Sequence, residues 1–155
     1  MPVPTGSQIV LSIFDRLTDE NPRQSRELPV TGWEQMAALK NSVARDLGTL
    51  LNTRISLADI PEEFEQVRES VAAYGVEDYT RSPVEKDGIR RSIERAVRAF
   101  EPRLTRVQVE LLSVSALELR FRIVASLKAD LGSEPVVFDA ALPKETRHFK
   151  VKEER

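Results

Sequence analysis

Carboxylates are the most numerous side chains in this sequence that could carry out acid–base chemistry. The chain of 155 residues contains 25 Asp and Glu residues. Hydrolysis of a glycosidic bond needs two carboxyl groups that flank the bond, roughly 5 to 9.5 Å apart. Pairs such as Glu62 with Glu63, or Asp78 with Glu101, offer the right groups, but neither pair belongs to a catalytic motif. We therefore predict no catalytic residue and no enzyme.

The side chains that usually bind metals or act as strong nucleophiles are almost missing. The sequence has no cysteine and a single histidine, His148. A disulfide, a thiolate metal site and a cysteine nucleophile are therefore excluded, and a zinc site is not expected. The six glycines are scattered, and they form neither a phosphate-binding loop nor a Gly-x-Ser-x-Gly turn. We predict no metal and no cofactor.

The motif Glu101-Pro102-Arg103 combines two opposite charges with a rigid residue. Pro102 fixes its own φ and favours an extended conformation for Glu101. In an extended segment the side chains of Glu101 and Arg103 point to the same side. The planar guanidinium could then bind a carboxylate or backbone carbonyls of a partner. The alternative is a helix end with a surface ion pair, which stabilises little.

Charge is unevenly distributed along the chain. Residues 1–79 carry 7 basic and 13 acidic side chains, whereas residues 80–155 carry 16 basic and 12 acidic ones. This polarity either favours head-to-tail contacts with charged partners or reflects two differently charged solvated faces. The most basic stretch contains Arg90, Arg91, Arg95, Arg98, Arg103 and Arg106. Glu94 and Glu101 interrupt it and no aromatic face accompanies it, so we expect a helix face that meets protein rather than nucleic acid.

The spacing of apolar residues predicts helices in the first two thirds of the chain. A short helix over residues 7–17 is followed by a breaker-rich linker to residue 30, and residues 31–155 form a single domain. A second helix begins at Thr31, with Glu34 completing a capping box, and runs to about residue 51. Residues 52–60 form a loop. A third helix begins at Pro61, has the inner face Phe64, Val67, Val71 and Tyr74, and stops at Gly75.

A fourth helix and a sheet complete the predicted fold. The helix begins with the capping box Ser82 to Glu85 and stops near Phe100, because Pro102 cannot continue it. Alternation of apolar and polar residues then predicts strands over residues 107–111, 117–127 and 136–140, with a short fourth over residues 148–151. We predict turns at residues 113–115 and at Gly132 to Pro135. The fold class is α+β, with N-terminal helices packed on one face of a C-terminal antiparallel β-meander of three to four strands.

No segment of the sequence predicts membrane insertion or secretion. No stretch approaches roughly 18 consecutive apolar residues, the length of a membrane span. Residues 1–6 have neither the basic nor the apolar region of a signal peptide. We therefore expect a soluble protein that is not secreted.

Four short stretches, taken in order, carry a family resemblance. They are Ser12-Ile13-Phe14-Asp15-Arg16-Leu17-Thr18-Asp19-Glu20; Val43-Ala44-Arg45-Asp46-Leu47 with Leu50-Leu51-Asn52-Thr53-Arg54; Ser70-Val71-Ala72-Ala73-Tyr74-Gly75-Val76-Glu77-Asp78; and Phe100-Glu101-Pro102-Arg103-Leu104. With these the sequence resembles the TssE family, the small baseplate proteins of bacterial type VI secretion systems, and the related lysozyme-like wedge proteins of phage baseplates. It departs from the family at Ala73, usually asparagine, and at Glu77, often proline.

The resemblance implies a structural part of a contractile injection machine. Proteins of this family join the wedge complex with TssF and TssG, and they present a surface from which the contractile sheath of TssB and TssC begins to polymerise. The resemblance also implies TssK as a further partner and a cytoplasmic location, in a baseplate docked at the inner-membrane complex. The alternative is an anti-adaptor-like regulatory binding protein of the same fold, which the Glu-Pro-Arg and Leu-Leu-Asn-Thr-Arg motifs disfavour.

The resemblance favours a first group of partner-binding residues, Glu101, Pro102, Arg103 and Leu104. A second group is the N-terminal segment Phe14, Asp15, Arg16 and Leu17, which a breaker-rich linker separates from the rest of the chain. That segment is either a docking helix or a helix packed on its own domain. An antiparallel sheet also leaves unpaired groups at its edges, to which a sheath subunit could add a strand. Residues 149–152 are the candidate edge, unless they only close their own sheet.

Overall fold

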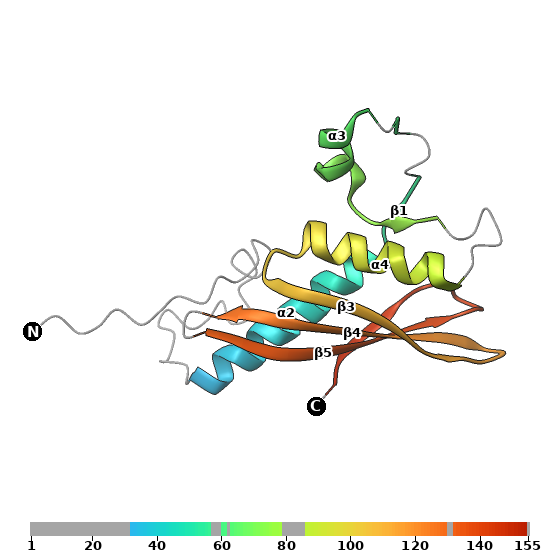
Figure 1. Cartoon of the computed structure of the whole chain (residues 1–155). Helices are drawn as coiled ribbons and strands as arrows, with labels where there is room; N and C mark the ends of the chain where they lie inside the picture. The colour runs from blue at the N-terminus through green and yellow to red at the C-terminus, as the bar shows by residue number, and fades with distance from the viewer. Residues whose placement is uncertain (1–31, 57–59, 62, 79–85, 130–131, 155) are drawn as a thin grey trace, which may run out of the picture.

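The computed structural model describes residues 32–56, 60, 61, 63–78, 86–129 and 132–154 (Figure 1). The predicted helix over residues 7–17, the linker to residue 30, the candidate docking segment Phe14 to Leu17, and the capping residues Thr31 and Ser82 to Glu85 lie outside these ranges. None of the described helices is long and apolar enough to cross a membrane.

Two long helices lie where the sequence predicts them. Helix α2 (Gly32–Asn52) and helix α4 (Lys86–Phe100) each bury an apolar face with helical spacing. The buried apolar residues are Leu39, Val43, Leu47, Leu50 and Leu51 in α2, and Ile89, Ile93, Ala96 and Val97 in α4. The end of α4 at Phe100, two residues before Pro102, confirms that the proline ends the helix.

The C-terminal half forms the predicted antiparallel meander. Strands β3 (Leu104–Val114), β4 (Glu118–Ala129), β5 (Gly132–Pro143) and β6 (Lys150–Glu153) lie in this order in one sheet. The predicted turn at Gly132 to Pro135 is wrong, because β5 already begins at Gly132, which pairs with Ala129. Pro135 is tolerated in β5 because β6 pairs only with residues 138–141, so β5 has no neighbour on that side at Pro135.

Both long helices cover the same face of this sheet, which confirms the α+β fold. Figure 1 shows α4 running along β3 while α2 crosses the strands at an angle. The space between them is filled by fully buried side chains, of which Phe121 on β4 and Phe138 on β5 are the largest. The opposite face of the sheet carries polar pairs, such as Arg122 with Asp139 at 3.3 Å and with Glu154 at 2.7 Å.

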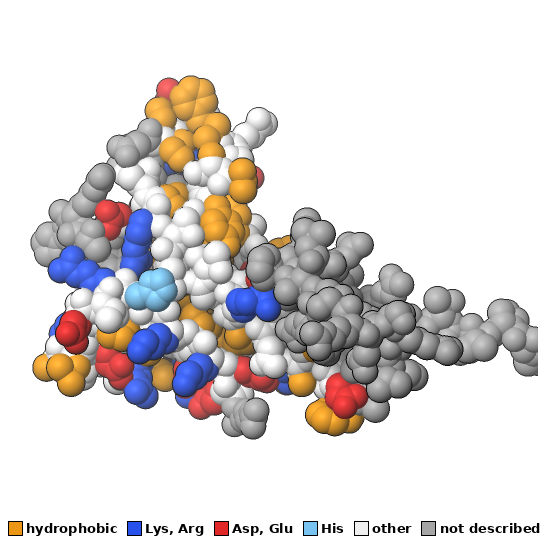
Figure 2. Space-filling view, turned by 180° about the vertical axis from the view of Figure 1, so that it is seen from behind, with side chains coloured by type: hydrophobic (Ala, Val, Ile, Leu, Met, Phe, Trp, Pro, Cys, Tyr) orange, Lys and Arg blue, Asp and Glu red, His pale blue; other side chains and the backbone are white. Residues whose placement is uncertain are grey.

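The predicted third helix, with an inner face of Phe64, Val67, Val71 and Tyr74, is wrong. The structure has a short helix α3 (Glu65–Glu69) and a 3-10 turn η2 (Val71–Ala73), and no residue of α3 is buried. Ser70 separates them, since its hydroxyl accepts a hydrogen bond from the N–H of Ala72 and favours a new turn. Phe64, Val67 and Val71 are 52%, 40% and 83% exposed. We call these three residues the α3 patch, and Figure 2 shows hydrophobic side chains gathered at this end of the molecule.

A two-stranded parallel ribbon joins the segment of α3 and η2 to α2, where the sequence predicts only a loop. Strand β1 (Arg54–Ile55) pairs with β2 (Val76–Glu77). Gly75 precedes β2 with φ of 130°, a conformation that L side chains rarely adopt. A Cβ at Gly75 would lie 2.5 Å from the carbonyl oxygen of Thr53, so the ribbon requires glycine at this position.

We predict opposite effects of two Gly-to-Ala substitutions on the free energy of unfolding. Gly75→Ala places a side chain against Thr53 in a strained conformation and is expected to destabilise the protein by at least about 1–3 kcal/mol. Gly48→Ala, in α2 with nothing within 4 Å of the added Cβ, is expected to stabilise it by up to about 1 kcal/mol. Urea unfolding followed by circular dichroism measures both. Equal stabilities of the two variants would contradict the close approach at Gly75.

Candidate functional site

The Glu101-Pro102-Arg103 motif forms a tight turn between α4 and β3. The N–H of Glu101 still donates to the carbonyl of Val97 at 3.0 Å, and the N–H of Leu104 donates to the carbonyl of Glu101 at 3.1 Å. The segment from Glu101 to Arg103 therefore turns and is not extended as predicted. Proline suits the second position of such a turn, because its fixed φ matches that position.

The turn brings the two charged side chains of the motif together, as predicted. Nε of Arg103 donates to Oε1 of Glu101 at 2.6 Å, and Nη2 donates to Oε2 at 2.5 Å. The backbone N–H of Arg103 also donates to Oε1, at 3.2 Å. Glu101 is only 4% exposed. This bidentate pair therefore lies inside the protein, where a charge without a partner is costly.

Arg103 also reaches across to helix α2. Its Nη2 lies 2.6 Å from Oδ2 of Asp46, and its Nη1 donates to the hydroxyl of the buried Ser42 at 3.0 Å. Burial lowers the pKa of Arg103, but the hydrogen bonds and charges of Glu101 and then of Asp46 outweigh it, so the pKa lies above its ordinary value. The four side chains, which we call the Arg103 network, thus connect the turn after α4 to the middle of α2.

The predicted partner-binding residues around this turn differ in exposure. Pro102 is exposed, whereas Leu104 belongs to the hydrophobic core and Arg103 has 14% of its side chain exposed. The structure therefore gives the motif a role in holding the fold together. Its contact with a partner stays a prediction, with Pro102 as the accessible residue.

A second candidate site lies at the edge of the sheet formed by β6. The side-chain amide of Asn52, at the end of α2, pairs with the backbone of Phe149 just before β6. Its Nδ2 donates to the carbonyl of Phe149 at 3.0 Å, and its Oδ1 accepts from the N–H of Phe149 at 2.7 Å. Asn52 thus occupies the place that a neighbouring strand would take at this residue.

Three further contacts involve β6 and the residues that precede it. Arg54 donates to the carbonyl of Arg147 at 2.7 Å and lies 5.9 Å from the ring of Phe149, which is buried. Lys40 on α2 bridges Glu134 on β5 at 2.6 Å and Glu153 on β6 at 3.3 Å. These contacts link β6 and the residues before it to α2 and β1.

Beyond Phe149 the outer edge of β6 is open in the part of the chain that the structure describes. The N–H of Glu154 donates to the carbonyl of Val137 on β5 at 2.9 Å. Because backbone groups alternate in direction along an antiparallel pair, Lys150 and Lys152 bond to β5 whereas Val151 and Glu153 direct their N–H and C=O outward. The candidate edge strand of the sequence therefore lies at a true edge of the sheet.

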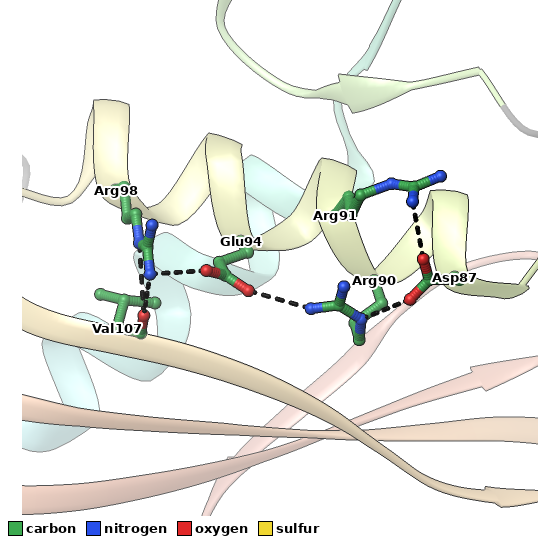
Figure 3. A network of polar contacts seen from close by, with 6 residues as sticks. All are labelled: Asp87, Arg90, Arg91, Glu94, Arg98 and Val107. Carbon is green, nitrogen blue, oxygen red and sulfur yellow. Dashed lines mark hydrogen bonds and ion pairs between the residues drawn. The ribbon is translucent and has the colours of Figure 1, made fainter.

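The opposite edge of the sheet, formed by β3, is irregular. Its pairing with β4 shifts register between Thr105 and Gln108 and again between Leu111 and Ser113. Arg106, inside the first shift, has a φ of 53°. Arg98 of α4 donates to the carbonyl of Val107 at 2.8 Å and 3.2 Å (Figure 3). Bulges and covered carbonyls both hinder the addition of a strand, so β6 is the better edge for a partner.

A sequence profile of one protein family matches this chain. The family is described as baseplate wedge protein gp25, and the match covers residues 37–131, more than half of the chain. The chain belongs to this family. TssE is the type VI homologue of gp25, so the resemblance noted in the sequence is confirmed. No curated protein and no solved structure matches the chain.

Membership of the family supports a structural role in a phage-like baseplate and implies contacts with other baseplate proteins. The matched residues include most of α2, all of α4 and the Arg103 network, whereas β6 lies outside them. Sequence reasoning singled out Glu101 and Arg103 but not Ser42, Asp46 or Asn52. Asn52 and Asp46 do belong to a stretch that carries the family resemblance, and this was the signal in the sequence that could have pointed to them.

We predict that removing the guanidinium of Arg103 destabilises the fold strongly. Arg103→Leu leaves Glu101 charged and buried without its partner, which is expected to cost about 3–5 kcal/mol of unfolding free energy. Arg120→Leu is the control, because Arg120 pairs with Glu118 but is 58% exposed; its expected cost is below about 0.5 kcal/mol. Chemical denaturation of both variants measures the difference. Similar costs for the two would mean that the Arg103 network contributes no more than a surface pair.

Proposed function

We propose that this protein is a structural component of a type VI secretion baseplate, where it joins the wedge complex and starts assembly of the contractile sheath. The open edge of β6, in a chain of the baseplate wedge family, is the observation that carries the proposal. In this proposal the protein joins the wedge with TssF and TssG, and the sheath subunits TssB and TssC assemble on it.

Strand addition at β6 is the proposed start of sheath assembly. A strand from a sheath subunit would bond to the outward N–H and C=O groups of Val151 and Glu153. Asn52 already pairs with Phe149, so an added strand would begin next to Asn52 and run along residues 150–153. Lys150 and Lys152 are exposed beside this edge and favour an incoming strand that carries acidic residues.

The remaining parts of the proposal concern location and further contacts. TssK is a further partner, and the assembled baseplate docks at the inner-membrane complex on the cytoplasmic side. Pro102 and the segment Phe14 to Leu17 are the proposed contacts with the wedge proteins. Among these residues Pro102 has a described environment, and its exposure supports the proposal.

Co-expression with TssF and TssG from the same source tests the wedge proposal. We expect the three proteins to elute together in size-exclusion chromatography. Pro102→Ala leaves the Arg103 network in place and is expected to weaken this co-elution. The control is Pro135→Ala, which changes an exposed proline on β5. Elution of the chain apart from TssF and TssG would overturn the wedge proposal and favour a regulatory binding protein.

A proline at position 151 tests strand addition. Val151→Pro removes an N–H that faces outward, so the ladder with β5 keeps its hydrogen bonds. We expect this variant to fold but to fail to start assembly of TssB and TssC, measured by sedimentation of sheath. Val151→Ala is the control, because it also loses the side-chain packing of Val151 but keeps the N–H. Equal sheath yields for the two variants would contradict strand addition at β6.

A further inference from the structure

The outward surface of α4 forms a shallow hollow rich in arginine. The hollow has a volume of about 510 Å³ and is lined by Arg90, Arg91, Glu94, Arg95, Arg98 and Ala99. We call it the α4 hollow. The fold uses part of this positive charge, because Arg98 donates to the carbonyl of Val107 and Arg95 to that of Gly75. The proposed sheath contact at β6 uses none of it.

Ion pairs fix most of these arginines in position. Arg90 contacts Asp87 at 2.7 Å and Glu94 at 3.1 Å, Arg91 contacts Asp87 at 2.8 Å, and Arg98 contacts Glu94 at 2.5 Å (Figure 3). These contacts follow helical spacing, and Figure 3 shows them as a continuous row along α4. Two carboxylates thus face several guanidinium groups, and the surface stays positive after the internal pairs are formed.

Arg95 differs from its neighbours because it has no ion pair within the described residues. Its Nη2 donates to the carbonyl of Gly75 at 2.9 Å, and its buried Nε has no hydrogen-bond acceptor. Burial lowers the pKa of Arg95, and the charge of Glu77 does not offset this effect. A partly buried guanidinium without an ion pair is stabilised by an anion that approaches its exposed side from outside.

Arg91, Arg95 and Arg98 lie on one stripe of α4, because their spacing of four and then three residues follows the helical repeat. Asp87 precedes this stripe and pairs with Arg91, and Glu94 lies beside it and pairs with Arg98, so two carboxylates serve the four arginines of the hollow. We propose that the α4 hollow binds an acidic segment of a partner protein, with carboxylates bound by Arg91, Arg95 and Arg98. Each carboxylate can accept two hydrogen bonds from a guanidinium fork.

A protein segment fits this surface better than nucleic acid or a membrane. The residues that line the hollow include no aromatic ring for stacking on bases. The chain as a whole has a net charge of −2, which opposes binding to an anionic surface. A flexible acidic segment can instead place single carboxylates on the arginines, each of which offers a bidentate fork.

Fluorescence anisotropy of the full chain with a labelled polyglutamate peptide tests the proposal. We expect saturable binding that weakens as salt is added, and no binding of a polyglutamine peptide of the same length. Polyglutamate requires neither TssF nor TssG, so this result is independent of the wedge proposal. Failure of polyglutamate to bind would overturn the acidic-segment proposal alone.

Matched variants locate the binding. Arg91→Glu is expected to weaken polyglutamate binding by about tenfold or more, because it replaces a charge-assisted contact with repulsion. Arg120→Glu is the control, since Arg91 and Arg120 are exposed, each paired with one carboxylate, but Arg120 lies on β4. Equal losses in the two variants would overturn the assignment to α4. Tighter binding of single-stranded DNA or of phosphatidylserine vesicles than of polyglutamate would also overturn it, in favour of nucleic acid or membrane.

Discussion

The contact of Arg103 with the buried Glu101 and the partly exposed Asp46 links separate parts of this fold. Glu101 comes from the end of α4 and Asp46 from the middle of α2, so one guanidinium connects both long helices to the start of the sheet. The buried charge of Glu101 needs a partner of opposite charge, so this contact favours one arrangement of the helices over others. A shift of α2 along the sheet would separate Asp46 from Arg103 and leave the guanidinium with one carboxylate fewer.

Much of this fold could be predicted from the sequence, because its helices and strands carry regular apolar patterns. The apolar faces of α2 and α4 and the alternation in β4 correspond to burial in the structure. The α3 patch shows the limit of such reasoning. Phe64, Val67 and Val71 have helical spacing, but no other part of the described chain covers them, and spacing alone does not tell whether a partner surface exists.

The candidate sites could be predicted less well, because they depend on contacts between residues far apart in the chain. Glu101 and Arg103 are neighbours in the sequence, so their pairing was predictable. Asp46 is 57 residues from Arg103, and Asn52 is 97 residues from Phe149, so these pairs needed the folded structure. The ribbon of β1 and β2 is too short to give an alternating pattern, and the positive φ of Gly75 is visible only once β2 lies beside Thr53.

The two edges of the sheet differ, and this difference limits how copies of the chain can associate. An endless fibril requires every molecule to offer two edges that fit one another. Here β6 is short and regular, whereas β3 has two register shifts and a carbonyl covered by Arg98. The β6 edge of one copy therefore does not match the β3 edge of another copy, so repeated edge-to-edge addition is disfavoured. The sheet is poorly suited to open-ended association of identical copies, because its two outer strands, β3 and β6, do not match.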